Sequence, residues 1–416
     1  MLGLITSSYS MSGDDDYALI TPGWTKLIGQ GGGRDDIIYR FQRLNNGNIV
    51  LGGSWCNDAG PGSCYTPVYG LLVGLDGSGN FLWGRHADFS NQWGCSGNGG
   101  RVTEITHVSP TSDGGFLAAG LLTYNVNDPW FGCISGDLDG FIAKFNFSGN
   151  LSWIRIVDYA ATDNIATTAF ETSDGNYVLV APSWYEIGVL KFSPSGSLIW
   201  QKRYPRSIAT STVYFSWAKP TSDGGIILTT HINGGAGYGD DVLFVKLNSS
   251  GNFVCAARIA TSGNDYGIDV AESNDHYWVT GSLGVGGNDL FIAKIRKTDC
   301  NVLQVRRLIS SANEQGISID IRPSTQIPYV AGYTNNPAWS SGGYDGLVAA
   351  DSGGPDACHW ETYTPTISNL TLSTSGTYTI YSPSMSVSSI SVSVQNVSIG
   401  RMIQCGLDPL GDDSEL

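Results

Sequence analysis

The sequence predicts an all-β protein, a six-bladed β-propeller followed by a small C-terminal β appendage. A strand–turn–strand unit recurs about every 50 residues, and its turns are rich in Asp-Gly, Asn-Gly and Ser-Gly-Asn. No segment has the periodicity of an amphipathic helix. A chain of 416 residues, 55 of them glycine, is long enough for one large domain of this kind.

The repeat is clearest where a lysine follows a short apolar run. Lys144, Lys191, Lys246 and Lys294 hold the same place in LDGFIAKFNFSGNLSWIRI (138–156), EIGVLKFSPSGSLIWQKRY (186–204), DDVLFVKLNSSGNFVCAAR (240–258) and NDLFIAKIRKTDCNVLQVR (288–306). An earlier copy is VYGLLVGLDGSGNFLWGRH (68–86). Each copy predicts two strands joined by a hairpin, because Asp-Gly and Ser-Gly-Asn supply the positive φ angles of tight turns.

A second hairpin precedes each of these units. Its turn reads NNGN (45–48), TSDGG (111–115), TSDGN (172–176), TSDGG (221–225), SNDH (273–276) and STQI (324–327) in successive copies. The flanking runs are short and β-branched or aromatic, which is typical of buried strands. Four strands in about 40–50 residues is the spacing of a propeller blade, so we expect six blades.

The pattern Thr-Ser-Asp-Gly-Gly, Lys-Leu, Ser-Gly-Asn and Trp resembles the repeats of secreted archaeal and bacterial β-propeller proteins. The resemblance covers roughly residues 23–364 and implies the propeller fold. It transfers no catalytic residue, because propellers of this kind serve many functions.

The charge and hydropathy of the sequence argue against nucleic acid and membranes as partners. Only 14% of the residues are charged, and the net charge is −15, so nucleic acid and anionic membranes are disfavoured. No window of about 18 apolar residues is present, and we expect no membrane span. The opening residues lack the basic and apolar regions of a signal peptide.

Cysteines and glycosylation sequons nevertheless indicate an extracellular or cell-surface protein. The eight cysteines are expected to form four disulfides between neighbours in sequence, Cys56/Cys64, Cys95/Cys133, Cys255/Cys300 and Cys358/Cys405. Five sequons predict N-glycosylation at Asn146, Asn150, Asn248, Asn369 and Asn396. No Cys or His spacing is that of a zinc site.

ADSGGP (350–355) resembles the sequence around the reactive serine of chymotrypsin-like proteases. The copy YDGLVAADSGGPDACHW (344–360) aligns with residues 138–153, which places Ser352 and Gly353 in the turn after the third strand of the sixth blade. No histidine has the sequence setting that such a protease requires. We therefore interpret this stretch as a hairpin turn and expect no catalytic residues.

Two sets of repeated or exposed side chains are candidate sites. Asp139, Asp241, Asp289 and Asp345 begin the third strand of four blades, and we weigh Ca²⁺ binding against simple capping of a repeated loop, which we favour. No cofactor other than Ca²⁺ is expected. Four tryptophans near the predicted blade ends are candidates either to stack on sugar rings or to pack between blades, namely Trp55, Trp130, Trp184 and Trp217.

The chain ends are the remaining feature. We expect an N-terminal arm over residues 1–22, the propeller over 23–364 and the β appendage over 365–416. Trp24–Gly29 and CHWETYTP (358–365) both match the fourth strand of a blade, so two segments compete to complete blade six. Residues 366–400 carry almost no charge, and the alternation of Ile390, Val392 and Val394 is that of a strand.

Three functions follow from these features. The favoured one is a non-enzymatic structural subunit of an extracellular filament, sheath or surface layer, a homo-oligomer or polymer held together through the chain ends. The alternative is a cell-surface propeller that binds glycans or proteins through its blade loops. An enzyme acting at the central channel is the least favoured interpretation.

Overall fold

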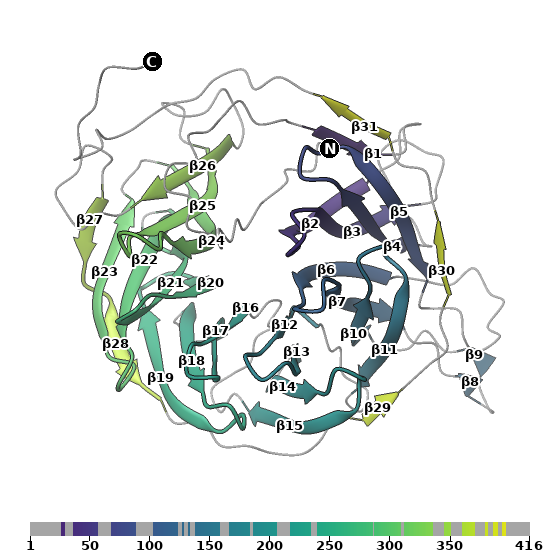
Figure 1. The fold of residues 1–416 in the computed structure, drawn as a ribbon. Helices are drawn as coiled ribbons and strands as arrows, with labels where there is room; N and C mark the ends of the chain where they lie inside the picture. The colour runs from purple at the N-terminus through teal and green to yellow at the C-terminus, as the bar shows by residue number, and fades with distance from the viewer. Residues whose placement is uncertain are drawn as a thin grey trace.

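A computed structural model describes residues 26–29, 36–56, 68–88, 103–123, 127–128, 132–133, 138–158, 166–183, 186–205, 217–233, 239–285, 287–308, 312–335, 345–350, 360–370, 379–381, 386–389 and 393–396. Every regular element in these ranges is a β-strand. Six small antiparallel sheets are arranged as a ring, which confirms the six-bladed β-propeller (Figure 1).

The blades follow one another along the chain, and each sheet runs from an inner strand to the rim. Blade 1 holds β2 (Asp36–Arg43), β3 (Ile49–Cys56), β4 (Val68–Leu75) and β5 (Phe81–Asp88). Blade 2 holds β6 (Thr103–Pro110), β7 (Phe116–Thr123), β10 (Leu138–Phe145) and β11 (Leu151–Asp158). Blade 3 holds β12 (Thr168–Glu171), β13 (Tyr177–Ser183), β14 (Glu186–Phe192) and β15 (Leu198–Pro205). Blade 4 holds β16 (Trp217–Pro220), β17 (Ile226–Asn233), β18 (Asp240–Leu247) and β19 (Phe253–Ala260). Blade 5 holds β20 (Tyr266–Glu272), β21 (His276–Leu283), β22 (Asp289–Arg296) and β23 (Val302–Leu308). Blade 6 holds β24 (Glu314–Ile321), β25 (Pro328–Thr334) and β26 (Asp345–Ala350). A separate pair, β8 (Asn127–Asp128) and β9 (Gly132–Cys133), lies between β7 and β10 in sequence.

The repeated turns fold as their sequences predict. In blade 4 the Thr221 amide donates to the Gly225 carbonyl oxygen at 3.0 Å and the Gly224 amide donates back to Thr221 at 2.9 Å. Gly224 adopts a φ of +77°, which L-residues rarely adopt. The turn therefore fixes the register of β16 against β17.

The core lies between consecutive blades. Each third strand of blades 1 to 5 carries an apolar side chain that faces the following blade, three residues after Tyr69, Asp139, Glu186, Asp241 or Asp289. This side chain is at most 2% exposed in blades 1 to 5, where it is Leu72, Ile142, Val189, Phe244 or Ile292. At the same position of blade 6, Val348 is 75% exposed.

The C-terminal strands run backwards around the rim and extend blades that the chain has already built. β27 (Trp360–Tyr363) pairs with β23, β28 (Thr366–Asn369) with β19, β29 (Thr379–Tyr381) with β11 and β30 (Ser386–Ser389) with β5. Four blades thus gain a fifth strand from the same chain (Figure 1). The described strands of the segment expected to form a C-terminal β appendage, β28 to β30, thus add to the outer edges of propeller blades.

Neither segment expected to complete blade 6 pairs with β26. Trp360–Tyr363 is the fifth strand of blade 5, because Leu308 in β23 pairs with Trp360. The N-terminal strand β1 (Lys26–Gly29) pairs with β31 (Ser393–Asn396). Blade 6 therefore has three strands among the residues that the structure describes. Ser352, Gly353, Ile390 and Val392 lie outside these residues.

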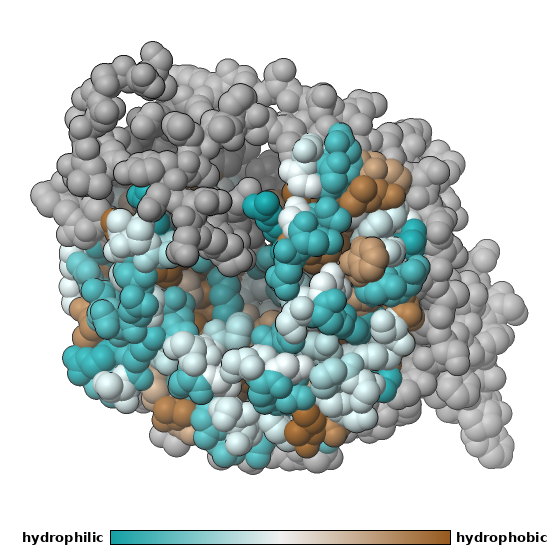
Figure 2. Space-filling model, viewed as in Figure 1, coloured by the Kyte–Doolittle hydropathy of each residue, from teal (hydrophilic) through white to brown (hydrophobic). Residues whose placement is uncertain are grey.

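No helix in the described ranges is both long enough and apolar enough to cross a lipid bilayer. Among the described residues on the face seen in Figure 2, most are hydrophilic, and hydrophobic ones are scattered among them.

Candidate binding site in the central channel

The inner strands of the six blades surround the axis of the ring (Figure 1). Each inner strand carries one residue at an equivalent position of the repeat. These residues stand four positions before the residue whose amide closes the first hairpin of the blade. They are Arg40, His107, Thr168, Trp217, Asp269 and Ser318. The repeats share their structural residues but differ completely here, so the channel has a chemistry that no single repeat reveals.

A pocket of about 120 Å³ lies within this channel. Its lining comes from β2, β6, β12, β16 and β20, so five blades contribute to one site. The polar side chains that line it include Arg40, His107, Lys219 and Asp269, and the aromatic ones are Phe170 and Trp217. An apolar and aromatic wall with a few converging polar groups is the usual form of a small-ligand site.

Arg40 is the most unusual side chain in this pocket. It is 4% exposed, and its guanidinium carbon lies 3.8 Å from the centre of the Trp217 ring. Within the described part of the chain, no carboxylate or other acceptor forms a hydrogen bond or ion pair with this guanidinium. Burial lowers the pKa of Arg40, and the more distant charge of Asp269 offsets part of that effect.

Asp269 and Lys219 neutralise each other beside Arg40. The Lys219 Nζ lies 3.1 Å from the Asp269 Oδ2 and donates to the Ile319 carbonyl oxygen at 2.8 Å. The same Oδ2 accepts from the Ser318 hydroxyl at 3.1 Å and from the Ile319 amide at 3.0 Å. Since Asp269 is held by these three donors, the positive charge of Arg40 stays uncompensated at short range.

His107 lies beside Arg40 and Lys219 in the pocket lining and is neutral. Burial, together with the charges of Arg40 and Lys219, holds the pKa of His107 well below its usual value. Its Nδ1 accepts from the Ala169 amide at 3.4 Å, so the ring proton stands on Nε2. His107 is therefore a neutral donor whose ring centre lies 5.9 Å from that of Trp217.

Two of the four repeated aspartates, for which Ca²⁺ binding was weighed against loop capping, pair with arginines. Asp241 accepts from the Arg258 Nε at 2.8 Å, and Asp289 lies 2.6 Å from the Arg307 Nη1. In blade 3 the same position is Glu186, which pairs with Arg203. Burial raises the pKa of Asp289 to about 6, against the lowering effect of Arg307. The side chain of Asp345 lies outside the described residues, and among the described ones no group of three His, Cys, Asp or Glu could hold a metal ion.

Asp139 stands at the same position in blade 2. Its side chain is buried, and blade 2 has Ile156 where blades 4 and 5 have the pairing arginine.

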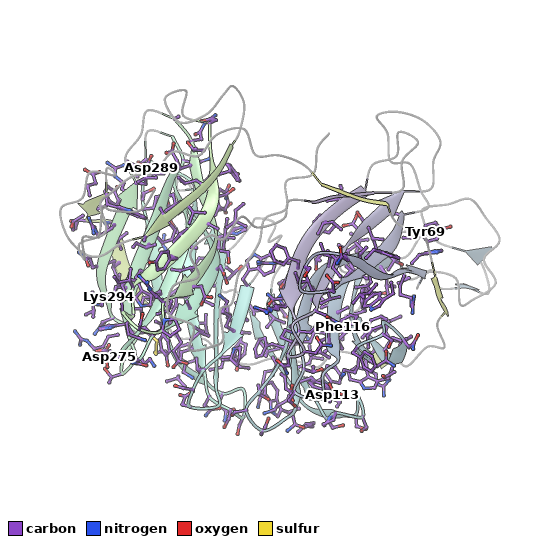
Figure 3. All side chains as sticks on the ribbon, turned by 45° about the horizontal axis from the view of Figure 1, so that its top comes forward. Tyr69, Asp113, Phe116, Asp275, Asp289 and Lys294 are labelled. Atoms are coloured by element: carbon purple, nitrogen blue, oxygen red, sulfur yellow. A yellow bond between two sulfur atoms is a disulfide. The ribbon has the colours of Figure 1, made fainter. Side chains whose placement is uncertain are left out.

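The Asp–Arg pairs and the turn aspartates occupy opposite ends of the blades, as Asp289 and Asp275 show in blade 5 (Figure 3).

The repeated lysines anchor the first hairpin of their blades. Lys144, Lys191 and Lys246 are each at most 4% exposed, and their Nζ atoms lie 2.7–2.9 Å from the turn aspartates Asp113, Asp174 and Asp223. Burial alone would raise the pKa of these aspartates, but hydrogen bonds from Thr and Lys lower it, to about 2 for Asp223. In blade 5, Lys294 lies 5.5 Å from the Trp278 ring instead.

Fourth-strand tryptophans join each blade to the next one. The Trp153 Nε1 donates to the Pro194 carbonyl oxygen at 2.9 Å, and the Trp83 Nε1 donates to Phe147 at 3.2 Å. A Cβ on Gly196 or Gly251 would lie 2.7 or 2.6 Å from the indole of the preceding blade. Glycine is thus required at these turns both for its positive φ and for the close approach of the ring.

The expected disulfide between Cys255 and Cys300 replaces the contact between a fourth-strand tryptophan and a turn glycine. Cys255 stands opposite Lys246, where Trp153 stands opposite Lys144, and Cys300 holds the positive-φ position of the blade 5 turn with a φ of 57°. The Cys255–Cys300 disulfide therefore links blades 4 and 5 where other blades use Trp and Gly.

The other three expected disulfides involve cysteines that the structure does not describe. Cys64, Cys95, Cys358 and Cys405 lie outside the described residues. Cys56 and Cys133 end β3 and β9, but their side chains are not described. The pairs Cys56/Cys64, Cys95/Cys133 and Cys358/Cys405 therefore stay predictions, including the proposed link between the sixth blade and the C-terminal segment.

The expected glycosylation sites are placed only in part. Asn146, Asn150 and Asn248 lie in third-to-fourth strand turns, with Asn150 and Asn248 exposed. The Oδ1 atoms of Asn146 and Asn248 accept turn amides at 2.9–3.0 Å. Asn369 and Asn396 end β28 and β31, and their side chains are not described. Glycosylation stays a prediction at all five positions.

Of the four tryptophans for which sugar stacking was weighed against packing between blades, Trp217 lies in the channel pocket. The side chains of Trp55, Trp130 and Trp184 lie outside the described residues. Sequence reasoning missed Arg40, Lys219 and Asp269 as site residues. The signal that could have found them is divergence at one fixed distance before the first hairpin turn of each repeat.

Comparisons with known proteins show similarity in fold and nothing further. No family model matches the sequence, and no curated protein matches it. Similar solved structures include the NanB sialidase of Streptococcus pneumoniae, as a K499G mutant, with 10% identity, 76% of this chain and 68% of that chain covered and a TM-score of 0.45. A candidate 6-phosphogluconolactonase from Bacteroides uniformis shares 10% identity over 79% of this chain and 87% of its own, with a TM-score of 0.43. A Dyadobacter fermentans protein of unknown function shares 11% identity over 78% of this chain and 97% of its own, with a TM-score of 0.42. At such scores the likeness carries no argument about function.

Proposed function

We propose that the protein is an extracellular binding propeller that holds a small ligand in its central channel. The single observation that carries this proposal is a pocket lined by side chains from five blades, four of which contribute different residues at the equivalent position, namely Arg40, His107, Trp217 and Asp269. The Cys255–Cys300 disulfide is compatible with the extracellular location.

The chemistry of the pocket favours binding over catalysis. Asp269 is engaged by Lys219, Ser318 and the Ile319 amide, and His107 accepts a backbone hydrogen bond. Neither group is thereby poised as a general base next to a nucleophile, which hydrolysis would require. A half-buried tryptophan with cationic and neutral donors around it instead suits a polar ligand that has both a flat face and hydrogen-bonding groups.

A glycan array probed with the labelled full chain tests this function. We expect signal on a subset of glycans and at least a tenfold loss of signal in Trp217→Ala. The matched control is Phe147→Ala, because Phe147 is 59% exposed in an outer turn and contributes nothing to the pocket. Equal binding by Trp217→Ala and the unsubstituted protein, or no binding to any glycan, would contradict a glycan ligand in the channel.

A structural subunit of an extracellular assembly is the second candidate function. The observation that favours it is the open face of blade 6, where Val348 is 75% exposed while its equivalents in blades 1 to 5 are buried. The strands β27 to β30 argue the other way, since they extend blades of their own chain. Negative-stain micrographs of concentrated full-length protein distinguish the two functions, because a subunit of this kind forms regular polymers.

A further inference from the structure

Resting on the channel-binding function, we infer that the ligand carries a carboxylate group and that Arg40 is its counter-charge. Arg40 is the only guanidinium in the pocket lining, it is 4% exposed, and it has no short-range acceptor within the described part of the chain. A buried unpaired cation is costly, and such a side chain in a pocket is explained by an anion that arrives with the ligand.

The other charges of the pocket limit the ligand to one negative charge. Lys219 and Asp269 lie 3.1 Å apart and cancel, and His107 is neutral, so the local excess is the single charge of Arg40. The planar fork of a guanidinium matches two carboxylate oxygens. The Trp217 ring lies 3.8 Å from the guanidinium carbon of Arg40, and the Nε2–H of His107 supplies a second donor.

Titration calorimetry with glucuronate, acetate and glucose tests this inference. We expect glucuronate to bind best, acetate to compete with it and glucose to bind at least tenfold more weakly. Arg40→Met should weaken glucuronate binding at least tenfold, because it removes the charge-assisted hydrogen bonds to the carboxylate. Arg296→Met is the matched control, since Arg296 pairs with Asp299 on the surface and its side chain is 48% exposed.

The unfolding midpoint of Arg40→Met gives an independent readout. Removal of an unpaired buried charge should raise the midpoint without ligand and abolish the further rise on adding glucuronate. Equal affinity for glucose and glucuronate, with Arg40→Met unchanged, would leave a channel site but overturn the carboxylate. If Arg40→Met lowers the unfolding midpoint and no probe binds the unsubstituted protein, Arg40 is a structural cation. That result would contradict both the channel-binding function and the carboxylate ligand.

A different observation carries a second inference, that β1 and β31 are the outer strands of blade 6. In every blade with a fifth strand, the last residue of the fourth strand pairs with the first residue of the C-terminal strand, as Ala260 pairs with Thr366. Gly29 of β1 pairs with Ser393 of β31 in the same way. β1 and β31 thus pair in the register that the fourth and fifth strands of other blades have, although they form a separate two-stranded sheet.

The order of the C-terminal strands leads to the same blade. They pass backwards from blade 5 to blade 4, then to blades 2 and 1, so the next blade around the ring is blade 6. Blade 6 is also the one blade that ends at its third strand in the described ranges. The sequence WTKLIG (24–29) matches WIRIVD (153–158) of the fourth strand in blade 2.

The length of the connection allows this placement. Five residues join a fourth strand to the next inner strand after β19 and after β23, and six residues separate β1 from β2. We propose that β1 docks on β26 and joins blade 6 to blade 1 through the two chain ends. This closure would cover Val348 as its equivalents are covered in blades 1 to 5.

An engineered disulfide tests the closure. By analogy with blade 2, where Ile142 pairs with Arg155, Val348 should lie opposite Lys26, at a separation of about 5 Å between Cα atoms. The double variant Lys26→Cys with Val348→Cys should form a disulfide within one chain, detected by peptide mass mapping. The control pair is Lys26→Cys with Val254→Cys, which lies in blade 4 and should stay unlinked.

The outcomes separate the alternatives. A link within a monomer supports closure by the chain ends. A link between two copies overturns intramolecular closure and favours the assembly function through exchanged strands. No link at all shows that β1–β31 does not lie on β26. None of these outcomes bears on the channel site.

Discussion

At the residue scale, the repeats are held together by polar side chains that are buried in pairs. Lys246 is 2% exposed and its Nζ donates to Thr221, to the Leu247 carbonyl oxygen and to Asp223 at 2.9–3.0 Å. A buried ammonium is tolerated only when its protons are all accepted. This explains why the turn sequence Thr-Ser-Asp-Gly recurs together with the lysine of the third strand.

Asp223→Asn should destabilise the protein by about 1–2 kcal/mol at pH 7, less than a fully buried pair would, because the Asp223 side chain is 59% exposed. The pKa of Asp223 is lowered to about 2 in the folded protein. Its contribution is therefore present above the unfolded value near 3.8 and is lost as the pH falls through about 2. Urea unfolding at pH 7, 4 and 2 should show the difference shrinking. Asp275→Asn, at the same turn position without a paired lysine, is the control and should change little.

Gly251→Ala should destabilise more than Gly224→Ala. Both glycines have a positive φ, near +72° and +77°, so both substitutions cost about 1 kcal/mol in backbone strain. A Cβ at position 251 would also lie 2.6 Å from the Trp200 ring, whereas the nearest atom to one at position 224 is 3.5 Å away. We expect a further loss of about 1–3 kcal/mol from this overlap, measured by urea unfolding. Equal losses would mean that Trp200 moves aside freely.

At the element scale, consecutive blades are joined by fourth-strand side chains that reach the next turn. Trp and Arg do this in blades 1 and 2, where Arg85 and Arg155 donate to the turn carbonyls of Gly149 and Gly196. The disulfide Cys255–Cys300 takes over this role between blades 4 and 5. The blades are thus equivalent in architecture while the chemistry of the joint varies.

The double variant Cys255→Ser with Cys300→Ser should lose about 4 kcal/mol, the chain-entropy value for a sequence separation of 45 residues. Cys255→Trp with Cys300→Gly should recover part of this loss, because it restores the Trp–Gly contact of the other blades. Urea unfolding of the three proteins without reductant measures both effects. If the Trp–Gly variant is no more stable than the Ser variant, the equivalence of the two joints is wrong.

At the scale of the whole molecule, the C-terminal strands cover outer edges that would otherwise be open. An exposed fourth-strand edge is a template for pairing with another chain. Deletion of residues 366–416 uncovers β19, β11 and β5, and we expect the truncated protein to self-associate while the full chain does not. Light scattering after size exclusion measures this, with deletion of residues 401–416 as the control. A polymeric full chain and a monomeric truncation would instead show that the C-terminal strands build an assembly.

Sequence alone determined the propeller, because each blade is specified locally. Turn residues with positive φ, such as Gly224, and the lysine periodicity act within about 50 residues of chain, and the Cys255–Cys300 pair lies within one such period. Only the tertiary structure decided the channel site and the route of the C-terminal strands. Arg40, Trp217 and Asp269 come from three different blades and meet only once the ring forms. An almost uncharged strand carries no local information about which of several equivalent edges it will pair with, since backbone hydrogen bonding is the same at each edge.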